Sequence, residues 1–379
     1  MQYFLAGGAV RDILIGVPPH EFDIVFDGTP EAFVRLQHAP VHTVGKNKQA
    51  YIVNGHEHTP LAGNIEENLT SRDLTINALL MTEDGVIHAL PQTFADLSNR
   101  IIRHVSPKSF FDDPVRVFRA ARFAAVFPDF TIAPETLAHM RSVANKCLLS
   151  NIAPERVGNE CVKALGGPCP SNFFHALAAT NCMAPWFSPL EKAHGIPAGP
   201  TKYHGKNSVF DHICEVLTRI AIMPYTQALS GEERKLAAWM GLCHDLGKMK
   251  TDPAILPRHI GHEKRGENMA AALAARLRLP MRWELAGRIA SKLHMKGGQY
   301  EHLRPGTKAD LLSTLAQNNL ARPFCALIMA DTDNATSGQM LLRDMEIFLS
   351  VKLPEKWWNM GANSAKKLRE LRIKALMHQ

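Results

Sequence analysis

The sequence predicts an α/β domain at the N-terminus and an all-α remainder. Within residues 1–105, short strand-like apolar runs alternate with short helical patterns, which is typical of a mixed sheet with helices. From Pro114 onward, apolar residues recur at helical spacing instead. The chain has 379 residues, which is long enough for two or three domains with substantial cores. Of these residues, 46% are hydrophobic and 21% are charged, as is usual for a globular protein.

Four regions are expected along the chain. A Pro/Gly-rich stretch over residues 195–200 marks the clearest domain boundary. A basic amphipathic helix is expected over residues 361–376, and we favour its docking on the preceding helices over contact with an RNA backbone. The regions are an α/β head, a helical neck, a second helical domain and a helical tail, at residues 1–105, 106–200, 201–345 and 346–379.

Composition limits the partners and the compartment. A formal charge of +7 and a pI near 9.0 favour a polyanionic partner. Seven cysteines without a CxxC pair indicate reduced thiols in a cytoplasmic protein. The N-terminal apolar run is broken by Arg11 and Asp12, so we expect no signal peptide, and no apolar run approaches the ~18 residues of a membrane span.

The first element is a strand near Phe4 that leads into Gly7-Gly8 and a helix carrying Arg11. A turn on Gly16 and two prolines follows. Together these residues predict a glycine-rich, basic turn of the kind that accepts phosphate groups.

The next element opens with Glu21 and Asp23 at the start of the apolar run 24–26. Alternate residues of a strand share a face, so the two carboxylates should project together. Adjacent carboxylates repel unless a cation lies between them, so beside the basic turn they predict Mg²⁺ and a phosphate-bearing ligand. An exposed acidic turn is the alternative interpretation.

The rest of the head reads as short elements. Thr29 caps a helix over 30–36, and residues 83–85 form a hairpin turn. Arg72 and Asp73 precede a further strand, where they could contact a ribose or triphosphate, or form a surface ion pair. Strands are expected at residues 24–26, 41–44, 51–53 and 86–90.

A helix beginning near Pro114 carries Arg116, Arg119 and Arg122 at i, i+3 and i+6, close to one face. A core helix rarely holds three arginines among apolar residues unless an anion meets them. This spacing therefore predicts an anionic ligand on the helix. Two further helices, over 134–143 and 154–165, are expected in the neck.

The second helical region carries histidines and aspartates at helix ends and turns. They occur in the order H…HD…H…H…D, and nitrogen and oxygen ligands with open coordination suit Ni²⁺, Mn²⁺, Co²⁺ or Fe better than thiolate-bound Zn²⁺. The candidates are His212, His244, Asp245, His259, His262, His294, Asp331 and Asp333.

The head motifs resemble those of class II tRNA nucleotidyltransferases and related bacterial poly(A) polymerases, members of the polymerase β superfamily. The matching segments are GGAVRD (7–12), RDLTINAL (72–79), RIIRHV (100–105) and DDPVRVFRAARF (112–123). The resemblance implies a polymerase-β-like head. It implies that Glu21 and Asp23 are catalytic and hold Mg²⁺ while an RNA 3′-hydroxyl attacks the α-phosphate of CTP or ATP.

The resemblance also assigns the remaining head residues. Gly8 and Arg11 would contact the triphosphate, and Arg72 the sugar or phosphates. Asp113 and Arg116 match an amino-acid template that mimics a Watson–Crick edge. The other two positions that match nucleotide contacts are Arg119 and Arg122.

The second helical region resembles the HD phosphohydrolase domain. His212, His244, Asp245 and Asp331 match its core metal ligands, with Asp333 as an alternative last ligand. His262 and His294 match extra ligands seen in some members. Lys248, Arg258 and Lys264 are interpreted as solvated surface residues rather than as phosphate contacts. Head, neck and HD domain together resemble bacterial multifunctional CCA proteins.

This chain departs from the family pattern at several positions. Glu21 stands where the family usually has the first aspartate of the metal pair. Asp112 stands where the template motif usually begins with glutamate, and Ser71 stands where an arginine usually precedes the Arg-Asp pair. The extra methylene of Glu21 moves the ligand oxygen by about a bond length, although Mg²⁺ demands near-ideal geometry. Residues 55–71 are shorter than the polar flexible loop that helps full CCA-adding enzymes switch from CTP to ATP.

The predicted function is tRNA 3′-end maturation by template-independent addition of C, or of C and A, from CTP and ATP. The short 55–71 interval favours restriction to CC addition. The HD domain implies 2′,3′-cyclic phosphodiesterase, 2′-nucleotidase or phosphatase activity. The alternative is an HD phosphohydrolase whose weakened head only binds RNA; poly(A) polymerase and a pure binding module are disfavoured. Whether the protein is a monomer or a homodimer stays open.

Overall fold

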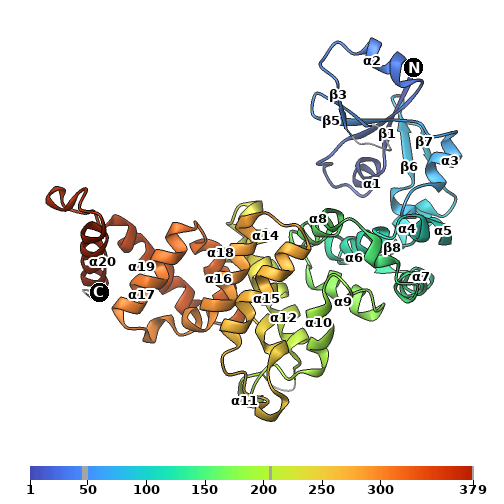
Figure 1. The fold of residues 1–379 in the computed structure, drawn as a ribbon. Coiled ribbons are helices and arrows are strands. Elements are labelled where there is room, and N and C mark those ends of the chain that lie inside the picture. Colours follow the sequence, from blue (N-terminus) through green and yellow to red (C-terminus); the bar gives the residue numbers. More distant parts are fainter. Residues whose placement is uncertain (45–49, 205–206, 378–379) are drawn as a thin grey trace. The chain divides into compact units, whose positions relative to one another are not determined.

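The structure, a computed structural model, describes residues 1–44, 50–204 and 207–377 of the chain (Figure 1). It divides into two compact units. The first contains Met1–Ile152 and Ala179–Cys182, and the second contains Ala153–Ala178 and Met183–Gln379. An α/β fold at the N-terminus and helices beyond it confirm the predicted fold class.

The first unit is built on a seven-stranded mixed sheet of order β3-β4-β5-β2-β1-β6-β7. β1 pairs antiparallel with β2 and β6, while β2 pairs in parallel with β5. The strands are β1 (Gln2–Ala6), β2 (Asp23–Asp27), β3 (His42–Val44), β4 (Ala50–Val53), β5 (His56–Pro60), β6 (Leu79–Thr82) and β7 (Ile87–Ala89).

The two faces of this sheet have separate cores because successive side chains of a strand point to opposite faces. Val25 of β2 belongs to a cluster with Phe4 and Leu80. Its neighbour Phe26 lies on the other face, where its ring stacks on Phe33 at 4.2 Å between centroids. The alternation fixes the register of β2 and therefore the face on which Asp23 lies.

Residues 55–71 are mostly regular structure, whereas the sequence suggested a shortened flexible loop. They contain β5, which pairs with β2, and the helix α3 (Ile65–Thr70). Asn64 and Glu67 form a capping box that fixes the start of α3. The connection between β5 and α3 is limited to residues 61–64. The polar composition of β5, HEHTP, concealed the strand, because it lacks the apolar alternation that marks most strands.

Seven α-helices, a 3-10 turn and a short parallel strand pair complete the part of the first unit used below. Their bounds are α1 (Gly8–Leu14), α2 (Pro30–Leu36), α3 as above, η1 (Thr75–Asn77), α4 (Thr93–Ser98), β8 (Ile101–Ile102), α5 (Pro107–Asp112), α6 (Arg116–Val126), β9 (Thr131–Ile132) and α7 (Pro134–Asn145).

Among the described residues of the second unit, the named elements are all helices, with an isolated antiparallel bridge between Pro197 and Ser208. Its interior is filled by large side chains such as Trp239, Tyr300 and Phe324. Its main elements are α8 (Pro154–Leu165), α9 (Ser171–Ala179), α10 (Ser188–Glu191), α11 (Thr201–His204), α12 (Val209–Ile222), α13 (Pro224–Gln227), α14 (Gly231–Cys243), η4 (Leu246–Lys250), α15 (His262–Arg276), α16 (Met281–Gly298), α17 (Pro305–Gln317), α18 (Ala321–Thr332), α19 (Ala335–Ser350) and α20 (Ala362–Met377).

The C-terminal helix α20 docks within the second unit, as expected from its amphipathic sequence. Arg369 donates to both carboxylate oxygens of Asp310 on α17, at 2.7 and 3.0 Å. Arg372 lies over the ring of Phe348 on α19, 4.0 Å from its centroid. No described helix combines the length and the apolar character needed to cross a membrane. All seven cysteines carry free thiols.

Candidate functional site

Three carboxylates gather at the start of β2 in the first unit. Asp23 is the first residue of β2, and Glu21 lies two residues before it; both are exposed. Glu57 of β5 is the register partner of Asp23 in the parallel pair. Burial, and then the charges of Asp23 and Glu21, raise the pKa of Glu57. This mutual repulsion is what a divalent cation would relieve.

Gly7 allows Arg72 to approach the turn after β1. Its φ of 60° and ψ of −120° are accessible essentially to glycine alone. A Cβ at this position would lie 2.9 Å from Arg72 Nη1. Burial lowers the pKa of Arg72, whereas the charges of Asp73 and then of Asp23 act to raise it. Arg72 Nε is buried without a hydrogen-bond partner, so the guanidinium retains donor capacity next to the carboxylates.

Arg11 is buried within the first unit. Its guanidinium donates to Asp12 Oδ1 at 2.7 and 2.9 Å and to the side-chain oxygen of Asn77. It also lies over the rings of Phe123 and Phe127, 5.2 and 4.8 Å from their centroids. These contacts join α1 to α6. The predicted triphosphate contact of Arg11 stays a prediction, as does that of Gly8, the first residue of α1.

Asp73 is buried and pairs with the partly exposed Arg119, instead of forming a surface ion pair with Arg72. Arg119 Nε donates to Asp73 Oδ2 at 2.6 Å. The other oxygen accepts from the Leu74 amide at 2.8 Å and from Asn77 at 3.2 Å. Although burial opposes it, Arg119 and these hydrogen bonds lower the pKa of Asp73 to about 2.

We expect Arg119→Met to destabilise the first unit by about 2 kcal/mol at pH 7, because an Asp pKa lowered from 3.8 to about 2 is worth that much. A lowered carboxyl pKa stabilises the native state above pH ~3.8, and this stabilisation is lost as the pH falls towards 2. The difference between wild type and variant should therefore shrink from pH 7 to pH 3.

Hydrogen exchange of peptides over 70–80 and 116–126 during urea titration would measure this effect, since all five tryptophans lie in the second unit. Arg100→Met is the matched control, because Arg100 pairs with Asp129 in an exposed ion pair and should change stability by less than ~1 kcal/mol. Equal losses in both variants at pH 7 would contradict the assignment.

The other two arginines of α6 are Arg116 and Arg122. Arg116 donates to the main-chain carbonyls of Arg72 and Ser71 at 3.0 and 2.8 Å, which ties α6 to the end of α3. Arg122 lies over the ring of Phe123, 4.0 Å from its centroid. Asp113 directly follows α5 and lies before α6. The structure thus gathers the predicted head residues within one unit, and their contacts with nucleotide stay predictions.

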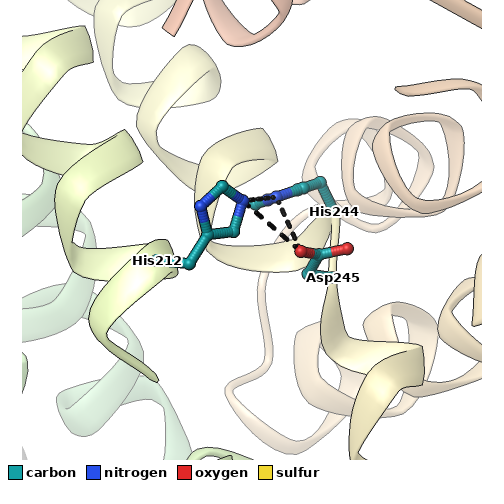
Figure 2. Close-up of side chains that lie close together, drawn as sticks. All are labelled: His212, His244 and Asp245. Atoms are coloured by element: carbon teal, nitrogen blue, oxygen red, sulfur yellow. Dashed lines mark hydrogen bonds and ion pairs between the residues drawn. The ribbon is translucent and has the colours of Figure 1, made fainter. Parts of the chain in front are cut away.

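The second candidate site is a buried cluster in the helical unit (Figure 2). It draws on five helices: His212 lies on α12, His244 directly follows α14, His262 begins α15, His294 lies on α16 and Asp331 lies on α18. Asp245 follows His244, and the five residues other than Asp331 are at most 6% exposed.

One half of this cluster surrounds Asp245 Oδ2. Figure 2 shows His212 and His244 pointing towards this carboxylate, with their Nε2 atoms 3.5 and 3.2 Å from Oδ2. The two Nε2 atoms lie 3.2 Å apart. Asp331 Oδ1 lies 3.0 Å from His212 Nε2 and 3.5 Å from His244 Nε2.

The other half surrounds Asp245 Oδ1. His262 Nε2 and His294 Nε2 lie 3.4 and 3.5 Å from this oxygen and 3.1 Å from each other. Asp245 Oδ1 is buried and accepts no hydrogen bond from the described residues. Asp245 therefore belongs to both groups of close ligand atoms, His212–His244–Asp245 and Asp245–His262–His294.

The hydrogen bonds of the histidines leave their Nε2 atoms available as metal ligands. In three of them Nδ1 lies against main-chain carbonyls and must carry the proton, so that in the neutral ring Nε2 offers a lone pair. These contacts are His244 to Gly241 at 2.7 Å, His262 to His259 at 2.7 Å and His294 to Ser291 at 3.0 Å.

Lone pairs and carboxylate oxygens thus face one another at 3.0–3.5 Å, an arrangement that needs a proton or a cation between them. Without a metal, a proton takes this place at His244. Burial opposes it, but the charges of Asp245 and Asp331 raise the pKa of His244 to about 10. Imidazole nitrogen with carboxylate oxygen fits a borderline transition metal.

The structure corrects the prediction for Lys248 and decides between Asp331 and Asp333 as the last ligand. Lys248 is not a solvated surface lysine: it is 7% exposed and its Nζ lies 2.7 Å from Asp245 Oδ2. Asp333, the alternative last ligand, points away and pairs with Arg219 at 3.6 Å with its side chain 77% exposed. Asp331 is the aspartate that reaches the cluster. Arg258 and Lys264 are exposed, as expected.

His259, a further candidate, is not among the clustered ligands. Its Nε2 donates to the Pro197 carbonyl at 2.8 Å, and its Nδ1 accepts from the Thr251 hydroxyl at 2.8 Å. Sequence analysis also missed Glu57 as a member of the head site. The signal that could have found it is the Asn54-Gly55 hairpin turn, which places Glu57 on a strand.

Three family models match the chain. The "Poly A polymerase head domain" matches residues 3–59, the "Probable RNA and SrmB-binding site of polymerase A" matches residues 129–193, and the "HD domain" matches residues 209–335.

Curated relatives named multifunctional CCA protein are similar along most of their length. The protein of Tolumonas auensis is 36% identical over 338 residues, covering 83% of this chain and 80% of the relative. That of Acinetobacter baumannii is 34% identical over 412 aligned positions, covering 99% of this chain and 97% of the relative.

Solved structures share the fold. The Thermotoga maritima CCA-adding enzyme complexed with tRNA has a TM-score of 0.67 and 18% identity, over 99% of this chain and 87% of that chain. The Bacillus stearothermophilus CCA-adding enzyme in complex with CTP has a TM-score of 0.65 and 23% identity, over 98% of this chain and 87% of that chain.

Proposed function

The chain belongs to the multifunctional CCA protein family, and from this we propose that it adds nucleotides from CTP, and in principle ATP, to the 3′ end of tRNA. The observation that carries the proposal is the group of Glu21, Asp23 and Glu57 beside the Arg72 guanidinium. A net charge of +7 favours binding of the tRNA backbone.

The chain's own residues would divide the work of the transfer. Glu21, Asp23 and Glu57 would hold Mg²⁺, which supplies electrostatic stabilisation of the charge on the reacting phosphate. Arg72, with donor capacity left at Nε, would orient the triphosphate. Gly7 and Gly8 would let the phosphates approach the main chain closely, since neither has a Cβ.

The base of the incoming nucleotide would be selected by Asp113 and Arg116. Arg116 is held by the carbonyls of residues 71 and 72, directly after α3. Because β5 and α3 replace most of the expected loop, we propose that this template is held in one arrangement and that the enzyme adds CC and stops.

We therefore expect CTP, but not ATP, to be incorporated efficiently. The assay uses tRNA lacking CCA and tRNA ending in CC, each with Mg²⁺ and one nucleotide at a time. Efficient CTP incorporation into tRNA lacking CCA, with ATP incorporation into the CC-ended tRNA at least about a hundredfold slower, would support both proposals. Efficient A addition would remove the restriction to CC, and no incorporation of either nucleotide would remove the transferase assignment.

For the second site we propose a metal-dependent phosphohydrolase that acts on 2′,3′-cyclic phosphates, 2′-nucleotides or other phosphomonoesters. A transition metal such as Ni²⁺ or Mn²⁺, held by His212, His244, Asp245, His262, His294 and Asp331, would supply Lewis acidity and activate water. Asp331 has the most accessible of these side chains, 16% exposed, so the substrate would approach from its side.

A further inference from the structure

The segment Ile196–Ala198, within the stretch expected to be a domain boundary, is built into the helical unit. It lies antiparallel to the residues at the start of α12. The Ala198 amide donates to the Asn207 carbonyl at 2.9 Å, and the Val209 amide donates to the Ile196 carbonyl at 2.8 Å. Ala198 is fully buried. We call residues 196–198 the strap. It follows the RNA-binding family match at 129–193 and precedes the HD match at 209–335.

Two buried side chains bind consecutive main-chain carbonyls of the strap. Lys248 Nζ donates to the Ala198 carbonyl at 2.7 Å, and His259 Nε2 donates to the Pro197 carbonyl at 2.8 Å. Lys248 and His259 are 7% and 8% exposed. A carbonyl only accepts, so the His259 proton is on Nε2, and the Thr251 hydroxyl donates to Nδ1.

The same two residues also hold members of the histidine–aspartate cluster. Lys248 Nζ lies 2.7 Å from Asp245 Oδ2, and the His259 carbonyl accepts from His262 Nδ1 at 2.7 Å. Lys248 thus joins the strap to Asp245, and His259 joins the strap to His262. Partners of this kind orient ligands, and their loss generally costs 10- to 100-fold in metal affinity.

We infer that Lys248 and His259 are positioning residues that make the strap part of the metal centre, so that metal binding and strap order are coupled. The inference rests on the proposed metal-binding role of the cluster. Coupling between two events is reciprocal. A metal ion should order the strap, and a loosened strap should weaken metal binding by the same factor.

The test follows hydrogen exchange at the Ala198 amide and Mn²⁺ affinity by calorimetry, both in the full-length protein. In the wild type, saturating Mn²⁺ should slow exchange at Ala198 about tenfold or more. Lys248→Met and His259→Phe should each weaken Mn²⁺ binding 10- to 100-fold and reduce this slowing. His259→Gln keeps an N–H donor near the Nε2 position and should recover most of the affinity.

Lys250→Met is the matched control, since Lys250 is two residues from Lys248 and exposed. It should leave affinity and exchange unchanged. Affinity within twofold of wild type in both Lys248→Met and His259→Phe, or exchange at Ala198 insensitive to Mn²⁺, would overturn the coupling alone. A wild type that binds no Mn²⁺, Ni²⁺ or Co²⁺ would overturn the metal assignment as well. If Lys248→Met fails to fold, the His259 pair and the wild-type exchange still decide.

Discussion

Asp23→Asn is expected to lower CTP incorporation on the order of a thousandfold, equivalent to about 4 kcal/mol of transition-state stabilisation. The substitution removes a full charge from the group formed with Glu21 and Glu57 while preserving the shape of the side chain. Because these groups would hold Mg²⁺, the loss should fall on kcat more than on the KM for CTP. Quenched-flow incorporation of labelled CTP into tRNA lacking CCA would measure both constants.

Asp27→Asn is the matched control for this prediction. Asp27 is the last residue of the same strand, is exposed, and pairs with Gln2 at the end of β2 away from Glu21. Its substitution should change kcat by less than about twofold, as is usual for surface changes away from a site. A comparable loss in both variants would show that the strand, and not the Asp23 carboxylate, is responsible.

The Glu21→Asp variant tests the departure at the first metal ligand. If the extra methylene of Glu21 displaces the ligand oxygen, the shorter side chain should raise kcat, because small misplacements are costly in catalysis. Unchanged or lower kcat would indicate that the site around Glu57 is built for glutamate at this position.

Asp245→Asn is expected to remove metal from both halves of the helical cluster, since Asp245 belongs to both groups of ligand atoms. Phosphohydrolase turnover of a 2′,3′-cyclic nucleotide should fall on the order of a thousandfold or more. CTP incorporation should stay within about twofold of wild type, because the head residues belong to the other compact unit. Metal content by mass spectrometry and the two assays on one preparation would measure these effects.

Asp331→Asn and Asp333→Asn form a matched pair two residues apart. Asp331 Oδ1 lies 3.0 Å from His212 Nε2, whereas Asp333 is exposed and pairs with Arg219. Asp331→Asn should weaken metal binding by at least about tenfold, and Asp333→Asn should leave it unchanged. The reverse result would assign the last ligand to Asp333.

The local elements of the head were largely predictable because their signals are short-range. Thr29 caps α2 by accepting a hydrogen bond from Ala32, and the turn at 83–85 joins β6 to β7. Helix α6 forms where the helical spacing of apolar residues and arginines predicted it. The strand β5 was missed because its polar residues lack a period-two apolar pattern, although it forms a local hairpin with β4. Its parallel pairing with β2 joins segments remote in sequence and has no local signal.

The helical cluster shows the same division. The order of histidines and aspartates predicted a cluster, but it also included His259 and Asp333, which lie outside it. The resemblance to the HD domain named the six residues that the structure brings together. Lys248 was wrongly assigned to solvent, because a lysine is usually exposed and here its contacts with Ala198 and Asp245 bury it.

The sequence alone identified the candidate groups for chemistry: the carboxylates at the start of β2, the arginines of α6 and the histidine–aspartate series. It could do so because residue type and short-range spacing carry that information. The tertiary structure decided how these groups are held. It placed Glu57 opposite Asp23, paired Asp73 with Arg119, selected Asp331 over Asp333, and joined Asp245 to the strap through Lys248. Each of these depends on burial and on contacts between distant segments, which no local pattern encodes.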